Sequence, residues 1–190
     1  MTRVATTVFI CLALAAQPLQ ALTINGAAIP DTVSLPNSDT QLVLNGAGIR
    51  EKFFLDIYVG ALYLEKPMRD PAAILADTGP AGILMHFTYS KVEREKIIDG
   101  WTDGLAENLT AERMSVIKPR LEKFNTLFRT VVKGDVIRID YLPESGTQVR
   151  INDEWRGSVE GNDFFHDLLH IWLGAHPVSK SLKRDMLGQD

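Results

Sequence analysis

The chain has 190 residues, of which 45% are hydrophobic, and a formal net charge of −4 at pH 7. No cluster of basic residues is interleaved with aromatic residues, which argues against nucleic acid as a partner. The one cysteine, Cys11, lies in the first apolar run, so the rest of the chain has no disulfide, thiolate metal site or cysteine nucleophile.

Residues 1–21 have the features of a secretory signal peptide. Arg3 supplies the positive charge, residues 4–16 are an apolar core without acidic residues, and residues 17–21 resemble a cleavage region. That core is shorter than the about 20 residues needed to span a bilayer, and no later segment is apolar enough. We therefore expect an exported protein, periplasmic or secreted, without an integral membrane segment. Its mature part, residues 22–190, has the length of about one domain.

The first half of the mature chain is predicted to be mainly strand. The turn signal Asn25-Gly26 divides residues 22–41 into the pieces of a small hairpin. Residues 42–64 are dense in β-branched and aromatic residues and almost continuously apolar, which predicts strands covered on both faces. Glu51-Lys52 is the polar interruption in this run, and we expect a tight turn there.

Helical patterns follow. Asp70-Pro71 predicts a short helix through Ala76, because proline is favoured at the first helical position. After a strand over residues 82–89, Ser90 to Glu93 has the spacing of a capping box that begins a longer helix. The apolar face of that helix is predicted to carry Val92, Ile97, Trp101, Leu105 and Leu109.

The second half is predicted to hold a helix, a strand meander and two further helices. Residues 114–128 have a helical pattern that Pro119 should kink or restart. Because strands and helices come in blocks, the pattern favours an α+β fold with an antiparallel sheet. The other predicted elements are strands at residues 135–141, 146–151 and 154–159 and helices at residues 162–173 and 180–187.

Two motifs are given structural interpretations. Gly46 and Gly48 suggest a nucleotide loop, but the third residue after Gly48 is Glu51, and a strand follows where a helix N-terminus is needed. His166 and His170 have the i, i+4 spacing of metal ligands, with Asp163 one turn earlier. Since no third ligand is evident, we interpret these residues, together with Asp167, as the solvated face of a helix and expect no metal or cofactor. His86 is interpreted as a partly buried strand histidine.

Arg50 is the candidate for a functional cation. Gly46 and Gly48 leave space near it, and a turn at Glu51-Lys52 would place Tyr58 about three residues beyond the position opposite Arg50, roughly 10 Å along the strand. The two side chains could then converge on one carboxylate or oxyanion. In the alternative, Arg50 pairs with Glu51, Asp56 or a surface carboxylate and Tyr58 belongs to the core.

Several segments together carry a family resemblance. They are residues 44–50 and 58–65, the strand at residues 83–87 with the helix at residues 93–104, and residues 168–174 with Val178-Ser179. These segments resemble the chalcone isomerase-like family, and the resemblance covers nearly all of the mature chain. It implies an open-faced β-sandwich, in which helices are layered on a large antiparallel sheet and a ligand cleft lies between them.

The resemblance implies two ways of using Arg50. In the isomerases an arginine at this position stabilises charge during the cyclisation of a chalcone, but the other polar positions of those enzymes fall near Gly100, at Ile171 and near Val92 or Glu93. An Arg and Tyr pair at residues 50 and 58 is similar to the fatty-acid-binding branch of the fold.

We therefore expect a non-catalytic protein that binds a fatty acid or similar amphipathic carboxylate through Arg50 and Tyr58, with Trp101 in the wall. An isomerase and a partner-binding protein with an occluded cleft are the alternatives.

Overall fold

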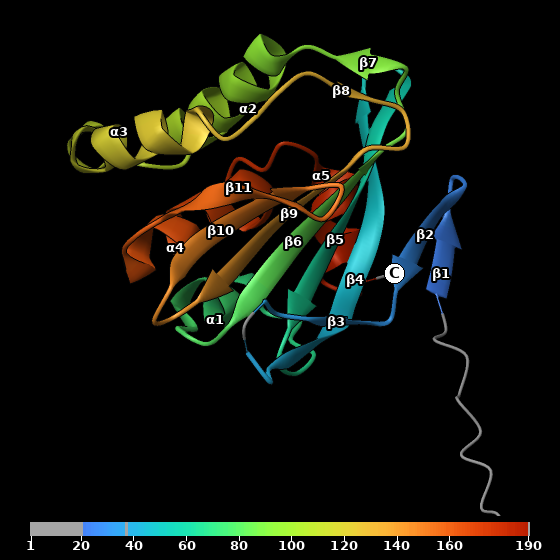
Figure 1. Ribbon diagram of the computed structural model, residues 1–190, viewed down its shortest axis with the longest axis horizontal. Coiled ribbons are helices and arrows are strands. Elements are labelled where there is room, and N and C mark those ends of the chain that lie inside the picture. The colour runs from blue at the N-terminus through green and yellow to red at the C-terminus, as the bar shows by residue number, and fades with distance from the viewer. Residues whose placement is uncertain (1–20, 37, 190) are drawn as a thin grey trace, which may run out of the picture.

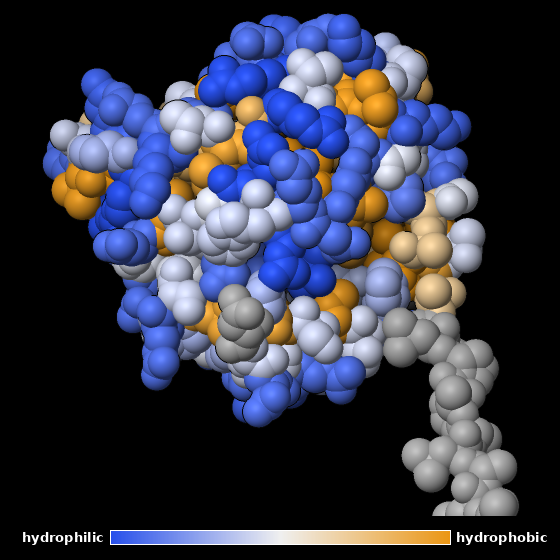
Figure 2. Space-filling model, viewed as in Figure 1, coloured by the Kyte–Doolittle hydropathy of each residue, from blue (hydrophilic) through white to orange (hydrophobic). Residues whose placement is uncertain are grey.

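The computed structural model describes residues 21–36 and 38–189. The predicted signal peptide lies outside the described residues except for Ala21, the first residue of β1. A hairpin of β1 (Ala21–Ile24) and β2 (Ala27–Pro30) comes first, as expected, and turns at Asn25-Gly26. Figure 2 shows apolar residues over this hairpin on a face that is otherwise largely hydrophilic.

A large antiparallel sheet dominates the described part of the chain (Figure 1). It has seven strands in the order β11-β10-β9-β6-β5-β4-β3, and each neighbouring pair is antiparallel. The predicted meander is confirmed as β9, β10 and β11. The strands of the sheet are β3 (Thr32–Ser34), β4 (Gln41–Lys52), β5 (Leu55–Leu64), β6 (Ala81–Phe87), β9 (Val136–Leu142), β10 (Gly146–Ile151) and β11 (Glu154–Val159).

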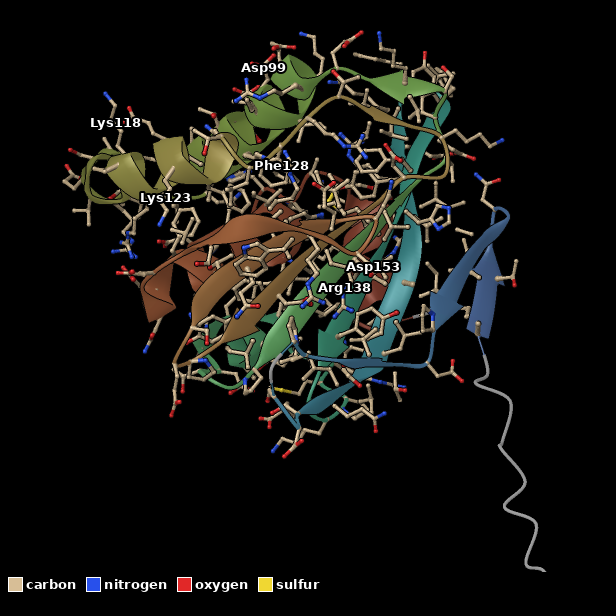
Figure 3. All side chains as sticks on the ribbon, in the orientation of Figure 1. Asp99, Lys118, Lys123, Phe128, Arg138 and Asp153 are labelled. Carbon is tan, nitrogen blue, oxygen red and sulfur yellow. The ribbon has the colours of Figure 1, made fainter. Side chains whose placement is uncertain are left out.

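The helices gather on one face of this sheet. Helix α5 contacts β4 and β5, α4 contacts β10, and α2 and α3 pack together against α4 and β11 (Figure 1). Phe128 lies between the α2–α3 pair and the sheet, whereas Lys118 and Lys123 point outward (Figure 3). Of the helices in the described residues, none combines the length and apolarity of a bilayer-spanning segment. The helices are α1 (Pro71–Ala76), α2 (Arg94–Ala106), α3 (Ala111–Asn125), α4 (Asn162–Leu173) and α5 (Lys180–Met186).

Apolar cores lie on both faces of the sheet. Along β5, Leu62 faces the helices and belongs to the larger core, while Ala61 and Tyr63 belong to a smaller core on the opposite face. The N-terminal segment covers that second face with Ile29 and Val33. This two-sided burial explains the almost continuous apolar run of residues 42–64 and confirms the predicted open-faced arrangement.

Helix α5 occupies the space beside Gly46 and Gly48, which corrects the expectation that these glycines leave open space. A Cβ on Gly46 would stand 2.1 Å from the backbone oxygen of Asp185, and one on Gly48 would stand 2.2 Å from the Asp185 carboxylate. Asn45 holds the helix end through a hydrogen bond of 2.8 Å from its Nδ2 to the Met186 carbonyl. The glycines therefore serve close packing of a helix on a strand.

The expected capping box at Ser90 to Glu93 is wrong. Lys91–Val92 forms strand β7, which pairs with β8 (Val131–Val132), and α2 begins at Arg94 without a side-chain cap. The Glu93 carboxylate is held instead by an ion pair of 2.6 Å with Lys91 and a hydrogen bond of 2.9 Å from the Thr130 hydroxyl. The local ion pair and the hydrogen bond from the distant Thr130 together outweigh the capping pattern.

Pro119 does not restart α3, which is one continuous helix over Ala111–Asn125. A proline inside a helix leaves the carbonyl four residues earlier without its donor. That carbonyl belongs to Ser115, and both Ser115 and Pro119 are exposed, so water can satisfy it. The predicted helix also ends early, since Leu127 and Phe128 lie beyond Asn125.

The turn between β4 and β5 lies two residues later than expected, at Phe53-Phe54. Glu51 and Lys52 belong to β4, and Lys52 pairs with Leu55. Both phenylalanines have positive φ, 50° and 64°, which is the backbone of a two-residue type I′ turn. Non-glycine residues held in such a conformation cost about 1–3 kcal/mol each.

Candidate functional site

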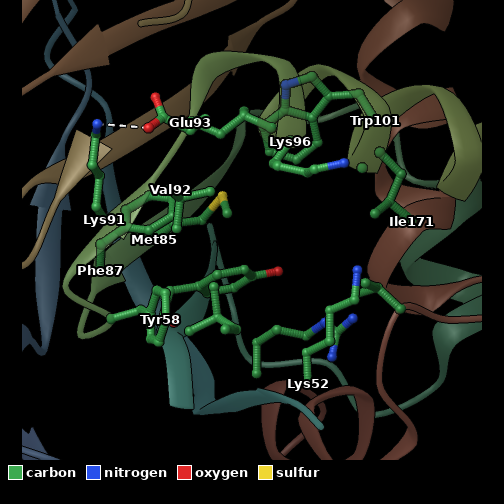
Figure 4. Close-up of a pocket in the computed structure, with 16 residues that line it drawn as sticks. Lys52, Tyr58, Met85, Phe87, Lys91, Val92, Glu93, Lys96, Trp101 and Ile171 are labelled. Carbon is green, nitrogen blue, oxygen red and sulfur yellow. Dashed lines mark ion pairs between the residues drawn. The ribbon is translucent and has the colours of Figure 1, made fainter. Parts of the chain in front are cut away.

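A pocket of about 330 Å³ opens between the helix-facing side of the sheet and α2 (Figure 4). Its apolar walls come from β6 (Met85 and Phe87), α2 (Ile97 and Trp101) and Ile171 of α4. The space beside Arg50 is therefore open, in contrast to the occluded cleft of one sequence-based alternative. The remaining lining residues are Arg50, Lys52, Ile57, Tyr58, Tyr89, Lys91, Val92, Glu93, Lys96, Gly100 and Val178.

Arg50 and Tyr58 are cross-strand neighbours, closer than the sequence suggested. Strands β4 and β5 pair Lys52 with Leu55 and Glu51 with Asp56, and the register then shifts so that Arg50 stands opposite Tyr58. The shift is a β-bulge with Ile57 as the extra residue. Side chains directly opposite each other on one face have Cβ atoms about 4.5–5.5 Å apart. Without the bulge Tyr58 would be one residue out of register with Arg50 and would point to the other face.

Tyr58 is fixed in the pocket wall and keeps its proton. It is only 7% exposed, its ring packs against Phe87 at 5.6 Å, and its hydroxyl accepts a hydrogen bond of 3.0 Å from the Trp172 indole N–H. Burial raises the pKa of Tyr58 to about 12, although the Trp172 hydrogen bond and the Arg50 charge both oppose that shift. The phenol is therefore neutral at physiological pH, and its O–H remains a donor for a ligand oxygen.

Trp101 lies across the pocket from Tyr58 (Figure 4). It is buried in a cluster of tilted aromatic rings, 5.3 Å from Phe128, 5.8 Å from Trp172 and 6.0 Å from Phe124. Its Nε1–H finds no acceptor among the described residues. Trp101 therefore contributes a rigid apolar wall, as expected, and also a buried donor that the sequence did not predict.

The charged side chains around the pocket are mostly basic. Arg50, Lys52, Lys91 and Lys96 line it, while the one acid among the lining residues, Glu93, is ion-paired with Lys91 (Figure 4). The Arg50 guanidinium donates to the Glu51 carbonyl, and the Asp56 carboxylate accepts from Asn25 at 2.8 Å instead of pairing with Arg50. Lys96 is also ion-paired, with Asp99 at 3.3 Å, so the excess positive charge of the lining is that of Arg50 and Lys52. Such a charge at an apolar pocket attracts a ligand with an anionic end.

Sequence reasoning missed Lys52, Lys91 and Lys96. Lys91 was hidden because residues 90–93 were interpreted as a helix cap, and Lys52 because it was placed in a turn. Lys96 lies beside Ile97 and one turn before Gly100 and Trp101 on α2, and all four line the pocket. The i, i+4 spacing of Lys96 and Gly100 on the predicted helix could have indicated that both face the pocket.

Of the two histidines on α4, His166 makes structural contacts and His170 is half-buried, which lowers its pKa. The two ring nitrogens of His166 contact the backbone carbonyls of Asn162 and Asp77. Asp163 accepts ion-paired hydrogen bonds from Arg120 and Arg113, which together hold its pKa well below the ordinary range. Within residues 21–36 and 38–189, no group of three or more His, Cys, Asp or Glu side chains is arranged to hold a metal.

Two further interpretations can be checked against the structure. The solvated-face interpretation of α4 is wrong for Asp167, which is buried and pairs with Arg113 at 2.6 Å. His86, opposite Val59, lies outside the residues that line the pocket, and burial lowers its pKa. Its partly buried strand position is as expected.

Comparison with known proteins places the fold. A solved fatty-acid-binding protein of Arabidopsis thaliana superposes with a TM-score of 0.68 at 17% identity, covering 88% of this chain and 96% of that one. The similarity shows a shared chalcone isomerase-type fold. A search of curated protein sequences finds no match. The family model described as chalcone isomerase-like matches residues 21–188. The chain belongs to the chalcone isomerase-like family.

The hydrogen bond between Trp172 and Tyr58 predicts the result of a conservative substitution. Tyr58→Phe leaves the buried Trp172 N–H without its acceptor, so we expect the free energy of unfolding to fall by about 1–3 kcal/mol. Tyr89→Phe is the matched control, because its less buried hydroxyl makes no hydrogen bond within the described residues, and we expect a change of about 0.5 kcal/mol or less. Urea unfolding measures both, and equal stabilities for the two variants would contradict the assigned role of Tyr58.

Proposed function

We propose that this protein binds an amphipathic carboxylate of the fatty-acid class in the pocket beside Arg50. The observation that carries the proposal is the pairing of Arg50 with Tyr58 at one side of an otherwise apolar pocket. A carboxylate removed from water needs a charge partner and hydrogen bonds. Arg50 supplies the charge and a two-pronged donor, and the neutral phenol of Tyr58 supplies a further O–H.

The apolar part of the ligand would lie against Met85, Phe87, Trp101 and Ile171. The cavity volume is at the lower end of the about 300–1,000 Å³ that is usual for small-ligand sites. The solved plant protein with this fold is a fatty-acid-binding protein by its description. Fold likeness at this identity supports the ligand class, while the polar pair and the basic surroundings are the evidence from this chain itself.

The lining of the pocket supports binding without turnover. Gly100, Ile171 and Val92, which the resemblance places at or near polar positions of the isomerases, all line the pocket. None of these three side chains can exchange a proton with a substrate, and the nearby Glu93 is held in an ion pair with Lys91. We therefore also propose that the protein does not catalyse the chalcone isomerase reaction.

We also propose that the N-terminal signal directs export of the protein and is then cleaved. The charge and apolar pattern of residues 1–21 support this, as does a family match that begins at residue 21.

Removing the Arg50 guanidinium is predicted to weaken binding of the acid. For Arg50→Ala we expect the Kd of a fatty acid to rise roughly ten- to hundredfold, because a charge-assisted hydrogen-bond pair is lost. Binding is measured by native mass spectrometry and by displacement of a fluorescent fatty acid. The fatty alcohol of the same chain length is the matched ligand, and its Kd should change little.

Arg69→Ala, a change at an exposed arginine that does not line the pocket, is the control variant. Unchanged fatty-acid affinity in Arg50→Ala would remove Arg50 from the site, and equal losses for acid and alcohol would show that the pocket was only deformed.

The proposal predicts that cyclisation of a hydroxychalcone proceeds no faster with the protein than in buffer. The reaction is followed by the loss of chalcone absorbance, with Arg50→Ala as the comparison. Acceleration by the unmodified protein that disappears in this variant would establish an isomerase instead.

The export proposal predicts a mature chain that starts at Leu22. Intact-mass analysis of the periplasmic or secreted fraction from cells that express the full chain checks this. A protein that retains residues 1–21 and stays in the cytoplasm would contradict it.

A further inference from the structure

The hairpin tip, defined as Phe53, Phe54 and Leu55, is the most exposed apolar feature in the described residues. Phe53 is 84% exposed, Phe54 is fully exposed and Leu55 is 46% exposed. The three side chains are consecutive, so they form one apolar point at the end of β4 and β5. Large apolar side chains gathered at one exposed place mark an interaction site more often than single ones do.

The turn does not require these phenylalanines. Two other two-residue hairpin turns in the chain, Asn25-Gly26 and Asn152-Asp153, have the same pair of positive φ angles. Both use residues that tolerate this backbone, whereas the β4–β5 turn uses two bulky aromatic residues that do not. Folding alone favours Asn or Gly at Phe53 and Phe54, so their presence points to a role outside the fold.

The tip stands at the basic side of the pocket. Lys52, which immediately precedes it, lines the pocket together with Arg50 and also lies over the Phe53 ring, 5.8 Å from its centre. Lys91 and Lys96 also line the pocket, but Lys91 is ion-paired with Glu93 and Lys96 with Asp99 at 3.3 Å. The other acids nearby are Glu51, which is exposed, and Asp56, which accepts from Asn25. The positive charge that borders the apolar tip is therefore that of Lys52 and Arg50.

We propose that the hairpin tip docks on a lipid bilayer that carries anionic headgroups. Phe53 and Phe54 would enter the boundary between headgroups and acyl chains, and the neighbouring basic side chains would contact the anionic headgroups. The docking is peripheral and brings the pocket mouth to the membrane surface. It goes beyond ligand binding and does not depend on it, because neither Phe53 nor Phe54 lines the pocket.

The size of the tip favours a bilayer over a protein partner. Two phenylalanines bury roughly 300–500 Å², whereas each partner in a specific protein interface of standard size buries about 800 Å². A bilayer has no such requirement, because it surrounds each inserted side chain. The tip is therefore suited to shallow insertion into lipid.

The test replaces the tip with residues that suit its backbone. In the double variant Phe53→Asn with Phe54→Gly, the turn gains its preferred residues, so the melting temperature should be unchanged or higher. We expect the unmodified protein to co-sediment with vesicles of phosphatidylcholine and phosphatidylglycerol, and less with pure phosphatidylcholine. The double variant should bind the mixed vesicles about tenfold or more weakly.

Trp155→Ser is the matched control. Trp155 is also an exposed aromatic residue, 52% exposed, but it lies on β11 at the edge of the sheet opposite to β3 and β4. This variant should bind vesicles like the unmodified protein. Equal vesicle binding by the double variant, or no binding by the unmodified protein, would overturn the proposal. A dimer that dissociates on changing the tip would overturn it in favour of self-association.

Fatty-acid affinity in vesicle-free solution is measured on the same variants. It should be unchanged in the double variant, because neither phenylalanine lines the pocket. Loss of vesicle binding with retained fatty-acid binding supports docking by the tip. If the unmodified protein binds vesicles but has no affinity for fatty acids, the proposed pocket function is refuted and docking by the tip is not.

Discussion

The pairing of β4 with β5 is the constraint on which the candidate site depends. A two-residue turn at Phe53-Phe54 starts the register, and the bulge at Ile57 then shifts it by one residue. Only with both features does Tyr58 stand opposite Arg50 on the face that borders the pocket. Because side chains alternate between faces with a period of two, a slip of one residue would send Tyr58 to the other face of the sheet.

The same strand pair is fixed from both sides. Helix α5 packs so closely on β4 that a side chain at Gly46 would overlap its backbone. On the opposite face, the N-terminal segment covers Ala61 and Tyr63. The indole of Trp172 then holds the Tyr58 hydroxyl. The polar pair is therefore placed by rigid elements, which lowers the conformational entropy that the protein must lose when a ligand binds.

The pocket and the hairpin tip share one short stretch of chain. Arg50 and Lys52 line the cavity, and the next three residues form the apolar tip. A carboxylate site and a membrane-docking point on one hairpin would let an amphipathic molecule pass between bilayer and pocket over a short distance. The excess of basic groups suits both steps, since an anionic headgroup and a fatty-acid carboxylate are attracted by the same charge.

Local patterns in the sequence determined the order of elements, the α+β class and the two-sided burial of residues 42–64, because hydrophobic period and turn residues report burial and chain reversal. They also singled out Arg50 with Tyr58 and placed Trp101 on a helix face, and the family resemblance then connected the Arg and Tyr pair with fatty-acid binding. Tertiary structure decided the rest. The turn at Phe53-Phe54 has backbone angles that its residues disfavour, the bulge at Ile57 is a pairing property of two strands, and the Glu93 carboxylate accepts a hydrogen bond from Thr130, 37 residues further along the chain. None of these is encoded in a short window of sequence, because each depends on contacts made only when the strands and helices have assembled.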